Sequence, residues 1–255
     1  MCGDITARTQ EVEKVGKGSA APEMQRFGLY FRLQHILMVV SVTILVITAI
    51  PLWCSRYPFS ELAAGIIDFC GGLESVRVVH HWAGFMLIFA FAFHVLYVLV
   101  HPGGRRDFLL MLPRRKDFND LDQNVRYFLG KSDNRPRFGR FSYFEKFDYW
   151  AVFWGCIIMI GTGFIMLYPQ AVAAFLPQTW TNTVFAVARE AHYHEAILAA
   201  LALFTWHVFN VHLRPEKFPG SMVWWHGKIT REEQEREHPL ECEEVLFIST
   251  IKKDM

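Results

Sequence analysis

Apolar residues are concentrated in four long runs along the chain, with polar segments between them. The runs cover residues 36–53, 82–100, 149–168 and 196–213, and none contains Asp, Glu, Lys or Arg. About 20 consecutive apolar residues are enough for a helix to cross the ~30 Å hydrocarbon core of a bilayer. We therefore predict an all-α protein, an integral membrane four-helix bundle with one transmembrane helix in each run.

A weaker apolar run covers residues 171–188. Pro177 interrupts this run, and a cluster of polar residues follows the proline: Gln178, Thr179, Thr181 and Asn182. A proline inside a helical pattern ends or bends the helix. We expect a surface-lying or partly helical connection here rather than a fifth transmembrane helix.

Lys and Arg near the helix ends predict the orientation, because cytoplasmic loops are enriched in both residues. The loop at 102–146 has eleven of them, the loop at 54–79 has only Arg56 and Arg77, and the connection at 169–195 has only Arg189. We expect a multi-pass protein of the cell inner membrane whose basic loop and both termini face the cytoplasm.

Polar segments divide the chain into an N-terminal cytoplasmic tail at 1–30, a transmembrane domain at 31–215 and a C-terminal cytoplasmic tail at 216–255. The basic loop mixes apolar and charged residues at roughly helical spacing. This pattern fits an amphipathic segment against lipid head groups or a partner, and it also fits an ordinary solvated loop. The 26 basic residues nearly balance 25 acidic residues, so the overall charge gives no indication of nucleic-acid binding.

The five cysteines form no metal-binding motif, and the sequence has no C-x-x-C-H for covalent haem attachment. Cys54 and Cys70 fall in the same predicted outer loop, where a disulfide and two free thiols are both chemically allowed. The histidines are the more informative residues.

Eight of the eleven histidines lie within the predicted transmembrane helices or at their ends: His35, His80, His81, His94, His192, His194, His207 and His212. An imidazole is costly to bury in hydrocarbon without a polar partner, so each is a candidate for function. A single such histidine could equally be no more than a hydrogen-bonding residue between helices. Several of them at matching depths on facing helices favour a function.

Helical geometry places these histidines at two depths. His80 and His94 are separated by about 21 Å along a helix and about 40° around it, so they share one face. His194 enters near the same outer surface as His80, and His207 lies about 20 Å deeper. Helix one runs in the opposite direction, which brings His35 to a depth similar to that of His94 and His207.

The two depths give an outer pair and an inner set, the outer pair being His80 with His194 and the inner set being His35, His94, His207 and His212. Paired imidazoles on facing helices can be the axial ligands of a b-type haem, and helix bundles commonly build such sites in their cores. The histidines therefore predict haem iron as the bound metal and haem b as the cofactor.

Five stretches of the chain match a known family: RLQH (32–35), VRVVHHWAG (76–84), EKFDYWAVFWGCIIMIGTGFIMLYP (145–169), HEAILAALALFTWH (194–207) and GKITREEQEREHP (227–239). Together they span most of residues 26–240. The chain resembles the membrane cytochrome b subunits of respiratory formate dehydrogenase (the gamma subunit), Ni-hydrogenase and thiosulfate reductase.

The resemblance implies two b haems, one near each membrane surface, with quinone chemistry beside the inner haem. It implies His80 and His194 as the outer ligands, and His35 and His207 as the inner ligands. The two histidines of helix four are separated by thirteen residues here, whereas the formate dehydrogenase subunits have fourteen. His94 and His212 are additional to the family pattern.

The two additional histidines leave a second assignment open. His194 and His212 are five full helical turns apart and share a face, whereas His207 points about 140° away from that face. His94 with His212, and His35 with His207, could then be separate inner pairs. That arrangement would give three haems per chain instead of two.

These observations predict an electron-transfer subunit of an oxidoreductase complex, with no catalytic residues and no independent catalytic domain. It would transfer electrons, in either direction, between menaquinone or ubiquinone and a periplasmic iron–sulfur or multihaem c-type cytochrome subunit. Arg32, His35, His212 and Lys217 supply polar groups for a quinone at the inner surface. Basic residues at helix ends also serve as anchors to lipid head groups.

Two other classes of protein compete with this interpretation. A histidine-rich membrane transporter, or a proton or metal relay, predicts acidic partners for the histidines, and Glu195 is the nearest candidate. A structural anchor for a peripheral complex predicts histidines that can be removed and a protein without a chromophore.

Overall fold

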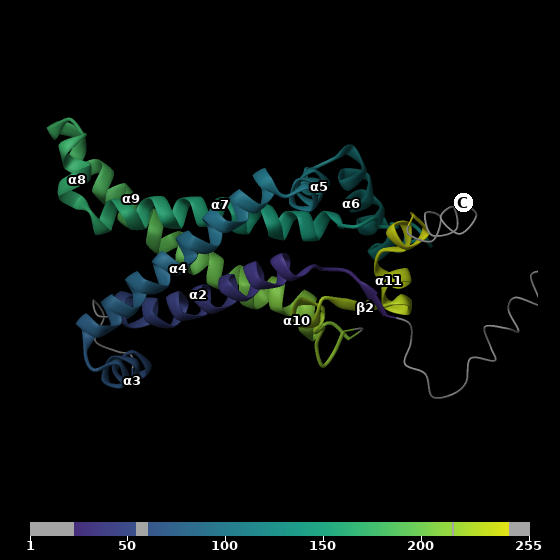
Figure 1. Ribbon diagram of the computed structural model, residues 1–255, viewed down its shortest axis with the longest axis horizontal. Helices are drawn as coiled ribbons and strands as arrows, with labels where there is room; N and C mark the ends of the chain where they lie inside the picture. Colours follow the sequence, from purple (N-terminus) through teal and green to yellow (C-terminus); the bar gives the residue numbers. More distant parts are fainter. Residues whose placement is uncertain (1–22, 55–60, 216, 245–255) are drawn as a thin grey trace, which may run out of the picture.

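The computed structural model describes residues 23–54, 61–215 and 217–244, and long helices dominate this part of the chain (Figure 1). They are α2 (Leu29–Cys54), α4 (Leu73–Val100), α7 (Tyr143–Leu167) and α9 (Gln178–Ala202). Helix α9 continues through two π-helical segments, η1 (Leu203–His207) and η2 (Phe209–Leu213). Each of the four helices is long and apolar enough to cross a membrane, so the predicted all-α bundle is confirmed.

The four helices form two hairpins. Helix α2 packs along α4, and α7 packs along α9, whereas the contacts of α4 with α7 and of α2 with α9 are much sparser. The buried residues of α4 recur at helical spacing along one face: Val76, Ala83, Leu87 and Ala90. Small residues such as these alanines allow helices to approach closely in a membrane. The two hairpins are therefore tight internally and loosely joined to each other.

The outer faces of the helices are apolar. Trp82 is 70% exposed, Phe89 is 62% exposed and Phe204 is 64% exposed. Apolar surface on this scale marks contact with a membrane or a partner rather than with water. Cys70, at the end of α3 (Glu61–Cys70), has a free thiol, and the side chain of Cys54 lies outside the described part of the chain.

The basic connection between α4 and α7 folds as two helices, α5 (Pro102–Met111) and α6 (Arg115–Phe128). Helix α6 leaves apolar side chains exposed at spacings of three and four residues: Phe118, Leu121, Val125 and Phe128. This spacing gives the helix one apolar face. The basic loop thus contains an amphipathic helix, and contact of this helix with lipid head groups or a partner stays a prediction.

Helix four begins much earlier than its apolar run predicts. The short helix α8 (Pro169–Ala174) ends before Pro177, and Pro177 is the N-cap residue of α9. A proline can end one helix and precede the next because the first turn of a helix does not need its missing N–H. The polar residues after Pro177 therefore form the first turns of α9, and the connection at 171–188 is largely helical.

Residues 227–242, which we call the C-terminal clamp, fold back on the N-terminal segment at the end of the bundle that carries α5 and α6. We call this end the basic end. Strand β2 (Lys228–Thr230) pairs antiparallel with β1 (Glu23–Gln25), and α11 (Arg231–Glu237) follows β2. Gly227 precedes β2 with φ of 78°, and a side chain there would collide with the Phe27 carbonyl oxygen. Glycine is therefore required at this turn. The short helix α10 (Val223–His226) lies just before it.

Arg26 connects the clamp to the bundle. Its buried guanidinium donates hydrogen bonds to Glu241 Oε2 at 2.8 Å and to the Arg140 carbonyl at 2.9 Å. It also donates to His238 Nε2 at 2.9 Å, while His238 Nδ1–H donates to the Gly139 carbonyl at 2.7 Å. Because Nε2 accepts a hydrogen bond from a guanidinium, the His238 imidazole is neutral.

Lowering the pH should loosen the clamp. Burial, as the largest cause, and the Arg26 guanidinium lower the pKa of His238 from its ordinary 6.5, and Glu145 and Glu237 partly offset the shift. Because the pKa of His238 is lower in the folded protein than the ordinary 6.5, the fold favours the neutral imidazole. Its contribution to stability is complete above pH 6.5 and is lost as the pH falls below that value. Amide hydrogen exchange in residues 231–242 should show more frequent opening at about pH 5 than at about pH 7.

The matched variants for this experiment are His238→Gln and His226→Gln. The first should abolish the pH step, and the second, at an exposed histidine of α10, should keep it. An unchanged pH step in His238→Gln would show that another group controls the clamp.

Candidate functional site

A cavity of about 2400 Å³ occupies the space between the two hairpins. Small-molecule pockets are usually about 300–1,000 Å³, so this cavity has room for more than one cofactor-sized group. Its lining is mostly apolar. The histidines of the transmembrane helices that line it are His35, His80, His81, His94, His192, His207 and His212.

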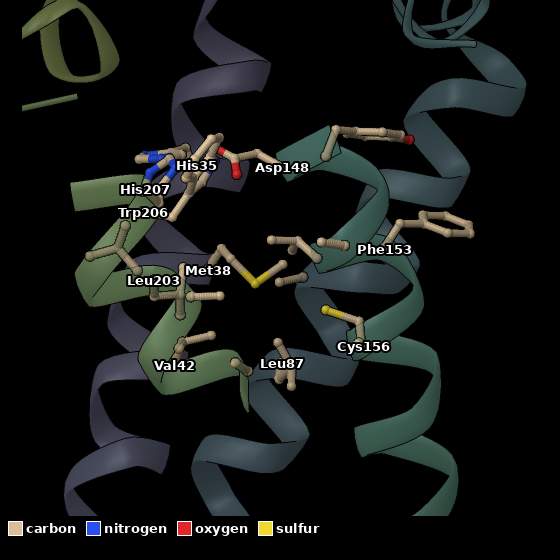
Figure 2. A pocket seen from close by; sticks show the side chains of 18 of the residues that line it. His35, Met38, Val42, Leu87, Asp148, Phe153, Cys156, Leu203, Trp206 and His207 are labelled. Carbon is tan, nitrogen blue, oxygen red and sulfur yellow. Dashed lines mark hydrogen bonds and ion pairs between the residues drawn. The ribbon is translucent and has the colours of Figure 1, made fainter. Parts of the chain in front are cut away.

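His35 on α2 and His207 on η1 face each other at the basic end of the cavity. Figure 2 shows both imidazoles directed into the same space, with the Asp148 carboxylate beside them. The ring centroids are 6.4 Å apart. Metal–imidazole bonds are about 2 Å long, so two rings that share one metal ion have centroids about 6 Å apart.

The ring nitrogens of this pair are suited to ligation. His207 Nδ1–H donates to Asp148 Oδ2 at 3.3 Å, so the Nε2 lone pair remains available. His35 Nδ1 is buried without a hydrogen-bond partner among the described residues. The rings of Phe31 and Trp224 pack against His35 with centroid distances of 6.5 and 5.7 Å. Apolar side chains, including Met38, line the cavity next to the pair (Figure 2).

His80 lines the cavity about 20 Å from this pair, as judged from the helical rise between His35 and Thr48 on α2. The Thr48 hydroxyl donates to the Ile44 carbonyl at 2.7 Å. Its oxygen therefore accepts from His80 Nδ1–H, at 2.8 Å. This hydrogen bond fixes the tautomer of His80 and leaves the Nε2 lone pair available.

His192 on α9 repeats this arrangement with another threonine. The Thr162 hydroxyl donates to the Ile158 carbonyl at 2.6 Å, and its oxygen accepts from His192 Nδ1–H at 2.9 Å. A side chain at Gly163 would lie 3.3 Å from His192 Cε1, so the glycine gives the imidazole room beside α7. Like His80, His192 lines the cavity with Nε2 available.

His194, the expected partner of His80, does not line the cavity. Its side chain is exposed, and Nδ1–H donates to the Glu190 carbonyl of its own helix at 2.7 Å. A separation of two residues turns a helical side chain by about 200°, which explains why His192 and His194 face opposite sides. The structure thus brings His80 and His192 to the cavity, instead of His80 and His194.

His192 and His207 share a face of helix four, and the π-helical segment η1 lies between them and includes His207. In a regular α-helix their separation corresponds to an angular offset of about 60°. A π-helical turn absorbs roughly one residue, which is equivalent to about 100° of rotation, so the offset becomes about 40° in the opposite sense and the two side chains still share a face. π-Helical turns inside α-helices often occur at functional sites.

His94 has both ring nitrogens engaged within the protein. Nδ1 lies 2.9 Å from Gln34 Oε1, and Nε2 lies 2.9 Å from the Tyr149 hydroxyl. No lone pair of this imidazole is directed at the cavity. His94 is therefore placed as a hydrogen-bonding residue between α2 and α7.

The remaining expected site residues lie at the basic end. His212 on η2 lines the cavity next to Gly220, where a side chain would come within 2.7 Å of His212 Nδ1. Arg32 donates to the Trp225 carbonyl at 3.0 Å. Lys217 forms ion pairs with Glu237 at 2.7 Å and with a second glutamate of α11. Arg32 and Lys217 thus hold the C-terminal segment as well as bordering the site.

Sequence reasoning did not identify Asp148, Thr48 or Thr162. Hydroxyl groups are common in apolar runs, and Asp148 lies just before the run at 149–168, so no spacing rule selects them. His192 was a candidate among the eight histidines, but the expected ligand spacing favoured His194.

The chain matches a family model described as prokaryotic cytochrome b561, of the Ni-hydrogenase cytochrome b type, over residues 26–217. This range includes all four transmembrane helices and the histidines that they bring to the cavity. The chain belongs to the prokaryotic cytochrome b561 family. The curated proteins contain no match to it.

Membership confirms the predicted resemblance to Ni-hydrogenase-type cytochrome b subunits. This cytochrome is a multi-pass membrane protein that binds haem b and takes part in electron transfer. Proteins of the family typically act as membrane subunits with redox partners. A b-type cytochrome is therefore the class of this protein, in place of a transporter, a proton or metal relay, or a structural anchor.

The residues of the cavity fit haem b. Two facing imidazoles have the separation expected for a shared metal ion, and His35 Nδ1 is a buried polar atom without a partner among the described residues. His80 and His192 each have one nitrogen held by a threonine and the other available. A ligating histidine in a metalloprotein typically donates its second nitrogen in this way.

Haem content should distinguish His192 from His194 as a ligand. His192→Ala should remove about one haem per chain, because it removes an imidazole that lines the cavity. His194→Ala should keep the full content, because this side chain is exposed. The haem-to-polypeptide ratio of the purified protein gives the answer. Loss of haem in His194→Ala with retention in His192→Ala would restore the assignment from the sequence.

Proposed function

We propose that this cytochrome transfers electrons across the cytoplasmic membrane between the quinone pool and an extracytoplasmic redox subunit, using two b haems. The observation that carries the proposal is the presence of two histidine pairs in one cavity, at depths about 20 Å apart. In each pair at least one imidazole has a nitrogen held by a protein group and the other nitrogen available.

The ligand assignment follows these contacts. His35 and His207 would hold the haem at the basic end, and His80 and His192 would hold the haem at the opposite end. When bound, haem supplies one-electron redox chemistry, which the side chains of this protein cannot supply. The assignment takes His192 in place of His194, because only His192 lines the cavity.

The protein groups around each pair orient the ligands and exclude water. Thr48 and Thr162 fix the tautomers of the pair at the opposite end. Asp148 orients His207 and, as a carboxylate, makes this imidazole a stronger electron donor to iron. The apolar lining lowers the local dielectric, which together with axial ligation determines the redox potential.

Two haems are better supported than three. A third would require His94 as a ligand with His212, and both nitrogens of His94 form hydrogen bonds within the protein. His212 keeps a position at the rim of the basic end. We propose that it borders the quinone site there, with Arg32 and Lys217.

Menaquinone or ubiquinone would react beside the haem at the basic end. Polar atoms without hydrogen-bond partners among the described residues concentrate there, including Arg32 Nε, Gln34 Nε2 and Trp224 Nε1. Buried donors of this kind need an acceptor, because an unsatisfied donor costs roughly 1–3 kcal/mol. A quinone carries two carbonyl oxygens that can accept hydrogen bonds.

In this proposal the basic end faces the cytoplasm, because Lys and Arg are most abundant in the connection that contains α5 and α6. Helices α3 and α8 would then face the periplasm. The redox partner there would be an iron–sulfur or multihaem c-type cytochrome subunit, which supplies or removes electrons at the His80 and His192 haem. The direction of transfer depends on that partner.

A visible spectrum of the purified protein tests the proposal. Reduction with dithionite should produce a sharp α-band of b-type haem, and the ratio should be two haems per chain. His35→Ala and His80→Ala should each remove about one haem, from different ends of the cavity. A ratio of three would contradict the role assigned to His94, and a folded, colourless protein would overturn the proposal as a whole.

A further inference from the structure

His94 belongs to a hydrogen-bond chain whose direction follows from the placement of the Gln34 amide oxygen. An amide oxygen can only accept a hydrogen bond, so the His94 nitrogen that faces Gln34 Oε1 must be Nδ1–H. The other nitrogen, Nε2, is therefore the acceptor, and the Tyr149 hydroxyl donates to it at 2.9 Å. The chain runs from Tyr149 through His94 to Gln34.

The chain ends on an amide that has hydrogens to donate. With its oxygen turned to His94, the Gln34 side chain presents Nε2 and its two hydrogens elsewhere. This nitrogen is buried and has no acceptor among the described residues, and Gln34 lines the cavity. Leaving such a donor unsatisfied is costly, which favours an acceptor on a molecule bound in the cavity.

The surroundings of Gln34 indicate the chemistry of that acceptor. Trp224 Nε1, from α10, is a second buried donor that lines the cavity without an acceptor among the described residues. Its ring packs on His35, the residue next to Gln34. The nearby carboxylate of Asp148 is already bonded to His207. Two buried donors without acceptors favour a molecule that brings acceptor oxygens to this part of the cavity.

We propose that Gln34 is a binding residue that donates a hydrogen bond to an oxygen of the molecule held beside His35 and His207, and that His94 and Tyr149 are positioning residues that fix the orientation of its amide. The inference rests on the proposed function. The acceptor is a carbonyl or carboxylate oxygen, which a quinone carbonyl and a haem propionate both provide. His94 thereby has a use that requires no third haem.

The test uses the purified, haem-containing full chain in lipid nanodiscs, with menadione as a soluble naphthoquinone probe. The equilibrium Kd for menadione, the haem content and the two haem midpoint potentials are measured for each variant. Gln34→Leu removes the donor. If the acceptor is a quinone carbonyl, the Kd should rise roughly tenfold, as expected for one lost hydrogen bond, while the potentials stay unchanged.

If the acceptor is a haem propionate, the same variant should shift the midpoint potential or lower the occupancy of the haem at the basic end, with an unchanged Kd. Either result supports Gln34 as a donor to a bound molecule. Unchanged Kd, potentials and haem content would overturn the inference, since ordered water alone would then satisfy the amide.

Tyr149→Phe tests the positioning role without altering Gln34, and it also serves if Gln34→Leu does not fold. Without the Tyr149 hydroxyl, His94 can change tautomer and the Gln34 amide can turn over. Whichever of the Kd, the midpoint potential or the haem content changes in Gln34→Leu should therefore change in the same direction in Tyr149→Phe, by a smaller factor. His94→Asn should stay closer to the wild type than His94→Ala in the quantity that Gln34→Leu changes, because the Asn amide N–H can replace His94 Nδ1–H as the donor to Gln34. Equal behaviour of these two variants would overturn the positioning role.

Tyr97→Phe is the matched control, because it removes a tyrosine hydroxyl from the same cavity wall, and Tyr97 packs on Tyr30 and His101 instead of on His94. It should leave all three measurements unchanged. A colourless wild-type protein would refute the proposed function itself, whereas a normal haem spectrum with no effect of Gln34→Leu would refute this inference alone.

Discussion

The cost of placing an imidazole in an apolar cavity between membrane helices determines the organisation of this protein. A ring nitrogen that meets neither a protein group nor a bound molecule loses the hydrogen bond that it had in water. Three of the ligand candidates meet this cost by donating Nδ1–H, His80 and His192 to threonines and His207 to Asp148. In each case the nitrogen that remains available is Nε2.

The cavity exists because the two hairpins pack tightly within themselves and sparsely against each other. A bundle with four equally close interfaces would leave no room for a flat cofactor. Helix four contributes to the same result, because His192 and His207 lie near one face of it and the π-helical turn at η1 does not separate them.

The basic end is closed by a part of the chain that lies beyond the residues matched by the family model. Trp224 packs on His35, and Arg32 holds the carbonyl of Trp225. The clamp is fixed in turn by Arg26, whose buried guanidinium joins Glu241 and His238 to the bundle. Buried ionic networks of this kind contribute little to net stability, but they disfavour alternative arrangements of the segments that they join. The clamp is therefore connected, through Trp224 and Trp225 just before it, to the residues around His35 and His207.

The sequence by itself determined the four transmembrane helices, the two depths of the histidines and the class of cofactor. Apolar runs without charges report the length of the hydrocarbon core, and a histidine position within such a run reports depth, because helical rise is constant. The resemblance of the sequence to Ni-hydrogenase-type cytochrome b subunits predicted the family, and the family match confirms it.

Only the tertiary structure decided which of two neighbouring histidines, His192 or His194, reaches the cavity, and that His94 forms hydrogen bonds with Gln34 and Tyr149. The angle of a side chain around a helix depends on where the helix starts and on every irregularity along it, and neither Pro177 as a helix start nor the π-helical turn is visible in hydropathy. Hydrogen-bond partners on other helices, such as Thr48 and Tyr149, depend on how the helices pack. The depth of a histidine in the membrane is therefore a local property that the sequence encodes directly, whereas the direction in which its side chain points depends on the assembled bundle.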